Sequence, residues 1–169
     1  MIADQKAEKD NQQTFWPLIA DDAIDRAMNT LIPQARTLIE ELFKNTRQQM
    51  ERHQFTNLVA VASETNSAEV VMDYVRYQIG RDSGGNTWRI RRPEQPDRPE
   101  FGIQLIEQLE GFRSMAKGLM LEAIRQYEIE PQDRAKEEKR LWMMLVRRFV
   151  NSLHHNFVYY DAEKKESHL

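Results

Sequence analysis

The chain has no cysteine among its 169 residues, which excludes disulfides, thiolate metal sites and cysteine nucleophiles. Its longest apolar run, LWMMLV at 141–146, is far too short to cross a bilayer. The polar start, MIADQKAEKDNQQ, lacks the apolar core of a signal peptide. These absences lead us to expect a cytoplasmic protein.

The motifs of common catalytic sites are also missing. The sequence contains no GxSxG elbow, no GxxxxGK[ST] phosphate loop and no HExxH zinc motif. Among the few histidines, His154 and His155 are adjacent, so on a helix they point about 100° apart and cannot share one metal site. We therefore predict no enzyme, no cofactor and no bound metal.

Charge is unevenly distributed along the chain. The net charge of −3 argues against an unselective polyanion binder. From 1 to 25, two lysines oppose six carboxylates, a net charge of −4, whereas from 76 to 98 six arginines oppose three carboxylates, a net charge of +3. Arginine suits bidentate phosphate contacts, although an arginine-rich loop can also serve solubility alone.

Apolar residues recur at three- and four-residue spacing along most of the chain. This period predicts an all-α protein, a single-domain bundle of about five helices over 16–160. A flexible polar arm is expected at 1–15 and a solvated tail at 161–169. A loop rich in glycine, proline and arginine is expected at 82–99.

Local signals place the ends of the first helices. Pro33 should end or kink the first one. The segment FTNLVAVAS at 55–63 fits either a buried helix or a strand. Asn66 with Glu69 resembles a capping box that opens a helix, and Gly80 is well placed to stop it.

Two long helices are predicted in the C-terminal half. The first covers 101 to about 127, where Gly111 and Gly118 share a face and suggest close contact with another helix. The last begins near Pro131, which suits a first turn, and continues to about Tyr160. Because LWMMLV is apolar all around, part of its surface is expected to serve as an interface.

Two stretches carry a family resemblance. The stretch VRYQIGR at 75–81 resembles the Tyr-Gln-x-Gly-Arg helix end of the small subunit of type III-A CRISPR effector complexes, the Csm interference complexes. The stretch RRFVNSLHHNFVYYDAEKK at 147–165 is similar to the aromatic-rich helix that ends that family. The order of the elements matches over 65–165. The long 82–99 loop, the N-terminal arm and the paired histidines depart from the family's pattern.

The resemblance implies a non-catalytic subunit of an RNA-guided complex. Several copies would stack head to tail as an inner filament beside the backbone subunits that hold the guide RNA, and would connect toward the large polymerase-like subunit. Such a subunit contacts the backbone of guide and target RNA without reading bases, because pairing supplies the sequence. Oppositely charged ends would also favour head-to-tail association.

Basic residues are the candidates for these RNA contacts. We expect the largest contributions from Arg81, followed by Arg147 and Arg148. The full predicted set is Arg76, Arg81, Arg89, Arg91, Arg92, Lys139, Arg140, Arg147 and Arg148.

Several alternatives stay open from sequence. Trp88 is expected either to pack on the bundle or to stack on a base. The group Arg140, Arg147 and Arg148 is expected either to bind RNA or to pair with Glu137 or Glu138. The chain could instead be a helical adaptor or regulatory protein that binds a protein partner through its C-terminal helix. A stand-alone DNA-binding protein is less favoured, because no helix-turn-helix signature is present. The small subunit of type III-B complexes, also all-α, fits as well.

Overall fold

The computed structural model describes residues 2–92, 94–125, 127 and 129–166, with side chains from Ala20 onward. Every regular element in this part of the chain is a helix, which confirms the predicted all-α class. The helices are α1 (Ile2–Phe43), α2 (Arg52–Glu64), α3 (Ala68–Arg81), α4 (Phe101–Ile124) and α5 (Pro131–Glu166).

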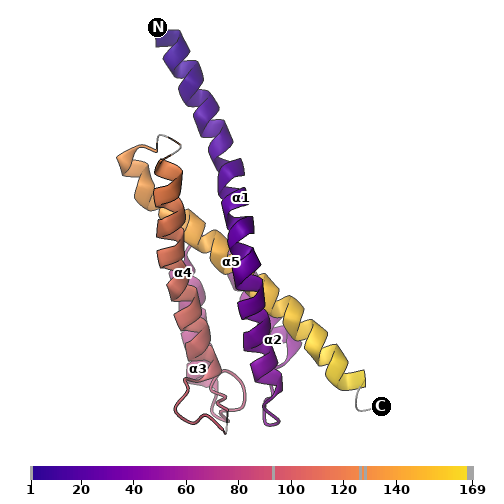
Figure 1. Cartoon of the computed structure of the whole chain (residues 1–169). Coiled ribbons are helices and arrows are strands. Elements are labelled where there is room, and N and C mark those ends of the chain that lie inside the picture. Colours follow the sequence, from indigo (N-terminus) through magenta and orange to yellow (C-terminus); the bar gives the residue numbers. More distant parts are fainter. Residues whose placement is uncertain (1, 93, 126, 128, 167–169) are drawn as a thin grey trace.

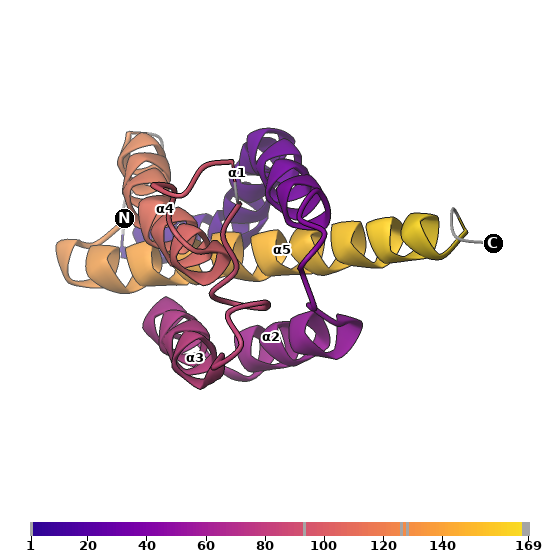
Figure 2. The same ribbon diagram turned by 90° about the horizontal axis from the view of Figure 1, so that it is seen from below.

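The five helices form three layers, with α5 in the middle (Figure 1, Figure 2). The helices α1 and α4 lie on one side of α5, and α2 and α3 lie on the other. All four contact α5. The connection from α1 to α2 passes from one outer layer to the other, and the loop between α3 and α4 passes back (Figure 2).

The apolar block of α5 accounts for its central position. Leu141, Trp142, Met143, Leu145 and Val146 together cover more than half of the helix circumference, and all five are buried. The Trp142 indole Nε1 donates to the main-chain oxygen of Leu109 on α4 at 2.8 Å. Met144 is partly buried and packs against the core, so this block is used within the chain, between the two layers, and not as the expected interface.

Pro33 does not end α1, contrary to the expectation. Its missing N–H and its ring cost roughly 3 kcal/mol in a helix interior. The cost is offset because Leu31, Ala35 and Ile39, on both sides of the proline, are fully buried against the core. Residues 2–15, expected as an arm, form the start of α1, which extends well past the other helices (Figure 1).

Residues 55–63, for which the sequence allowed either a helix or a strand, are helical and lie within α2. The start of α2 carries a capping box between Glu51 and Gln54 that the sequence analysis did not identify. The Glu51 main-chain N–H donates to the Gln54 side-chain oxygen at 2.8 Å. This reciprocal pairing satisfies donors that the first turn of a helix leaves without partners.

Both ends of α3 differ from expectation. Asn66 does not cap this helix, because its side-chain oxygen instead accepts a hydrogen bond from Arg147 at 2.8 Å. Gly80 does not stop it either, since α3 includes Arg81. Within the described residues, the positive φ angle belongs to Gly85 in the following loop, at 68°.

The close helix contact occurs at Gly102, whereas it was expected at Gly111 and Gly118. A Cβ at position 102 would lie 2.6 Å from Cγ1 of Ile79 and 3.0 Å from the main-chain oxygen of Trp88. At the other two glycines a Cβ would meet nothing within 4 Å, so that expectation is wrong. The absent side chain at Gly102 lets the start of α4 approach the end of α3.

The C-terminal helices agree with prediction except at their ends. The helix α5 begins at Pro131 as predicted, and it continues past Tyr160 to Glu166, with residues 162–166 exposed. The helix α4 ends slightly earlier than expected, at Ile124. In the part of the chain that the structure describes, no helix combines the length and the hydropathy needed to span a membrane.

Candidate nucleic-acid interface

The arginine-rich loop is anchored by Asp82. Its carboxylate accepts hydrogen bonds from the main-chain N–H groups of Gly85 at 2.9 Å, Thr87 at 3.0 Å and Arg89 at 2.9 Å. Partial burial by itself raises the pKa of Asp82, but these hydrogen bonds outweigh it and hold the pKa below its ordinary value. The carboxylate therefore stays charged and organises the start of the loop.

Trp88 anchors the same loop to the core. Its side chain is 1% exposed and packs against the rings of Phe55 and Phe101, with ring centroids 6.4 and 6.0 Å away. Ile90 is buried beside it. Of the two expectations for Trp88, packing on the bundle is confirmed, because the chain itself covers the ring.

Glu100, at the start of α4, holds two of the predicted RNA-binding arginines. One of its oxygens lies 3.4 Å from Nε of Arg89 and 3.1 Å from Nη2 of Arg91. The Glu100 side chain is only 10% exposed, so little water reaches its carboxylate and the two guanidinium groups balance its charge. Arg89 and Arg91 remain about half exposed.

Glu41 of α1 holds a second pair of loop arginines. Its two oxygens lie 3.2 Å from Arg92 and 2.8 Å from Arg98. The four arginines of the loop thus form ion pairs with two glutamates, one on α1 and one directly before α4. Much of the positive charge that the sequence concentrates at 82–99 is balanced within the chain.

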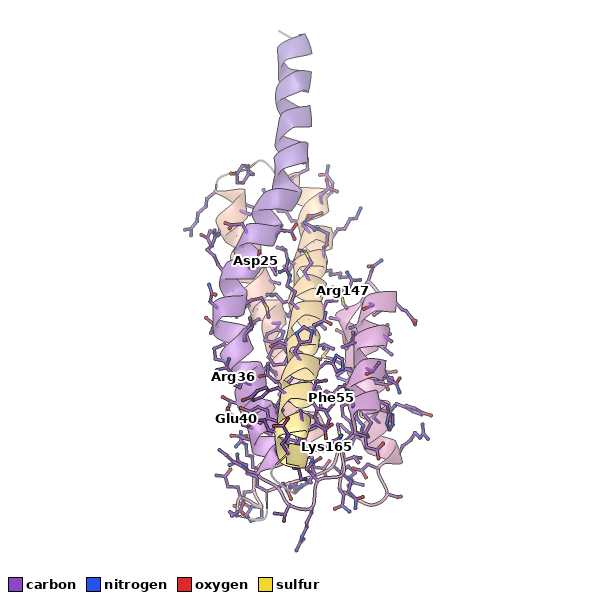
Figure 3. The ribbon with its side chains drawn as sticks, turned by 90° about the vertical axis from the view of Figure 1, so that its right-hand side faces the viewer. Asp25, Arg36, Glu40, Phe55, Arg147 and Lys165 are labelled. Atoms are coloured by element: carbon purple, nitrogen blue, oxygen red, sulfur yellow. The ribbon has the colours of Figure 1, made fainter. Side chains whose placement is uncertain are left out.

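Arg147 occupies the C-terminal end of α2. Its Nε donates to the main-chain oxygen of Ala62 at 2.9 Å, and its Nη2 donates to that of Thr65 at 2.5 Å and to the side chain of Asn66. A helix end leaves such carbonyl groups unpaired, and a cation there also interacts favourably with the helix dipole. Figure 3 shows Arg147 on the side of α5 that faces this layer.

Arg148, the next residue, points to the opposite layer. It forms ion pairs with Asp25 and, at 3.8 Å, with Asp21 on α1. Successive helical residues are about 100° apart, which is enough to send two adjacent arginines to different neighbours of a central helix. Arg147 and Arg148 therefore do not form one basic surface.

The two remaining α5 residues of the predicted set, Lys139 and Arg140, lie nearer the start of the helix. Arg140 donates from Nε to Glu137 at 2.8 Å, which is the intramolecular pairing that the sequence left open. Its Nη1 lies 3.4 Å from the sulfur of Met144. Lys139 is exposed. Neither side chain is close in sequence or layer to the arginines of the loop.

The end of α3 offers a different arrangement. Arg81 is exposed, and its guanidinium carbon lies 5.4 Å from the ring centroid of Tyr77, which is also exposed. Arg76 is exposed as well, but it lies about 140° round the helix from Arg81 and therefore points to a different part of the surface. Burial raises the pKa of Tyr74, opposed by a hydrogen bond from Gln78 and by the nearby charge of Arg81.

Tyr77 was not among the residues predicted for the site. A signal for it was present, because Tyr77 and Arg81 are four residues apart and residues at this spacing are neighbours on a helix surface. The predicted set was chosen by positive charge, so it contained no aromatic residue. The predicted set is therefore divided among the loop, the two sides of α5 and the end of α3.

The described histidines each have their own surroundings. His154 is half-buried, with Nε2 3.5 Å from the hydroxyl of Thr56, and its ring lies beside that of His155. His53 lies 3.0 Å from a carboxylate oxygen of Glu51. Among the described residues, no group of three or more His, Cys, Asp or Glu side chains is arranged to hold a metal ion. His168 lies outside the described residues.

No protein-family model, curated protein or solved structure matches this chain.

Proposed function

We propose that this protein is a non-catalytic small subunit of a type III CRISPR RNA-guided interference complex. In this role, several copies stack head to tail beside the backbone subunits and contact guide and target RNA without sequence specificity. Nuclease chemistry belongs to other subunits of such a complex. The resemblance of residues 75–81 and 147–165 to the family is the origin of the proposal.

The arrangement at the end of α3 is the observation that supports it best. The motif VRYQIGR forms the last turns of α3 and presents Tyr77 and Arg81 to solvent. An exposed arginine beside an exposed aromatic ring is suited to a nucleic-acid backbone and its bases. The motif that carries the family resemblance is thus also the part of the chain best shaped for an RNA contact.

The ion pairs of the other arginines limit the RNA affinity expected of a single copy. Because four loop arginines and Arg148 already face carboxylates, a single copy offers few phosphate contacts. We expect the isolated chain to bind RNA weakly and without sequence preference. Several copies along one RNA would add their contacts, as expected for linked binding sites.

A helical adaptor that binds a protein through its C-terminal helix has less support. Its partner would use the apolar stripe of α5, yet Trp142, Phe149, Leu153 and Phe157 are buried inside this chain. An adaptor would therefore need another surface. Tight, sequence-specific RNA binding by the isolated monomer would contradict both functions.

Co-purification tests the proposal directly. The tagged chain would be expressed with the untagged proteins and any guide RNA encoded beside its gene, which the proposal expects to include CRISPR backbone subunits and the large subunit. We expect it to purify within a ribonucleoprotein in more than one copy. A folded chain that purifies without these proteins and without RNA would overturn the subunit role, and recovery with an unrelated protein would favour the adaptor.

A further inference from the structure

Tyr77 points away from the core of the bundle. The buried residues of α3 occupy one face, and they are Ala68, Val71, Met72 and Val75. At about 100° per residue, position 77 lies on the opposite face. Tyr77 is 58% exposed, so its side chain is accessible to a partner.

Arg81 extends this exposed aromatic surface. Its guanidinium carbon is 5.4 Å from the Tyr77 ring centroid, and its Nη1 lies 3.4 Å from the tyrosine hydroxyl. A guanidinium group stacked on a ring keeps N–H groups at its edge for a phosphate. The two side chains together present an exposed aromatic ring with a positive charge near its hydroxyl group.

Neighbouring carboxylates determine where on this site a phosphate can bind. Asp82 directs its carboxylate at the loop, where it accepts three main-chain N–H groups. Asp73 is exposed one turn before Tyr77, so a phosphate is better placed toward Arg81. Of the ion pairs formed within the described residues, none involves Arg81.

We propose that Tyr77 and Arg81 bind one unpaired nucleotide of RNA, with its base stacked on the exposed Tyr77 ring and its phosphate held by Arg81. This inference rests on the proposed function and names the form of RNA that the site selects. Stacking accepts every base, because each base has a π-face. Bases within a duplex are covered by their neighbours, so the site favours a single strand.

The test compares two single strands of equal length, an oligoadenylate and an abasic ribose-phosphate strand. Fluorescence anisotropy would measure their binding to the full-length chain over a salt series. Tyr77→Ala should weaken oligoadenylate binding about 5- to 100-fold. It should leave unchanged both the affinity for the abasic strand and the salt slope, which is the slope of the log binding constant against log salt concentration. Arg81→Ala should weaken both strands and lower the salt slope by up to ~0.7.

Tyr159 on α5 supplies a matched control, because it is 57% exposed and lies on another helix. Tyr159→Ala should bind like the wild type, and so should Tyr77→Phe, which keeps the ring. Thermal unfolding should be the same for all the tyrosine variants. Equal effects of Tyr77→Ala and Tyr159→Ala would overturn the site. So would a Tyr77→Ala variant that loses as much affinity for the abasic strand as for oligoadenylate. So would a wild-type chain that fails to bind oligoadenylate at low salt.

The outcome is separable from that of the proposed function. A chain that joins the ribonucleoprotein while Tyr77→Ala binds like the wild type keeps its subunit role and loses the stacking site. A chain that stacks oligoadenylate through Tyr77 and never joins the ribonucleoprotein contradicts the subunit role instead.

Discussion

The guanidinium group of Arg147 on α5 lies against the end of α2, with its Nε 2.9 Å from the main-chain oxygen of Ala62. The same group reaches the turn before α3 through Thr65 and Asn66. One arginine therefore joins the central helix to the two helices of an outer layer. The placement of α3, and of Tyr77 on it, depends partly on this contact.

Arg147→Ala should lower the free energy of unfolding by about 1–3 kcal/mol, because three acceptors lose a charged donor. Lys139→Ala, an exposed change on the same helix, should alter it by no more than ~0.5 kcal/mol. Urea unfolding followed by circular dichroism measures both values. Equal stability of the two variants would contradict a structural role for Arg147 and return it to the RNA-binding candidates.

Gly102→Ala should destabilise the protein by about 1–3 kcal/mol, because its Cβ would overlap Ile79 and approach Trp88. Gly111→Ala is the matched control on the same helix. It should stabilise by about 0.5–1 kcal/mol, since alanine favours a helix interior and nothing lies within 4 Å of the new atom. Thermal unfolding would compare the two, and a stabilised Gly102→Ala would show that α3 and α4 are less closely packed.

Stability should depend on pH through His154. Burial, together with the charges of His155 and Arg52, lowers the pKa of His154 below its ordinary value of 6.5. The unfolded chain therefore binds this proton more readily, and the free energy of unfolding should fall as the pH drops below about 6.5. His154→Gln should make that fall smaller in urea unfolding between about pH 7 and pH 5. A variant with the wild-type pH dependence would rule out this contribution.

Asp82→Ala should loosen the loop without unfolding the bundle. The main-chain N–H groups of Gly85, Thr87 and Arg89 would lose their shared acceptor, and their hydrogen exchange should become about tenfold faster or more. Asp97→Ala, an exposed change in the same loop, should leave their exchange unchanged. Amide exchange followed by NMR resolves the individual groups. Unaltered protection in Asp82→Ala would mean that Trp88 and Ile90 alone hold the loop.

Much of the fold could be predicted from the sequence because helices and their buried faces depend on local spacing. The stripe through Trp142, Leu145, Phe149 and Leu153 was recognised, and all four residues are buried. Pro33 shows where local reasoning fails. Its intrinsic cost is real, but burial of the residues around it is a property of the packed bundle, and that burial keeps α1 continuous.

Less of the candidate site could be predicted, for a related reason. Charge counting identified Arg81, Arg92, Arg147 and Arg148. The partners expected for Arg147 and Arg148, Glu137 or Glu138, are not the groups that these two arginines contact. The observed partners lie far away in the chain: Glu41 for Arg92, and main-chain groups of α2 for Arg147.

The sequence by itself determined the helical class, the buried stripes and the number of arginines near the loop, since each follows from residue type and spacing. Only the tertiary structure decided that α5 is the central helix, that adjacent arginines face opposite layers and that Trp88 is buried. Ion pairs and hydrogen bonds act over a few ångströms, so they depend on which distant residues the packing of the layers brings together. Tyr77 and Arg81 stand out because that packing leaves them on the outer face of α3.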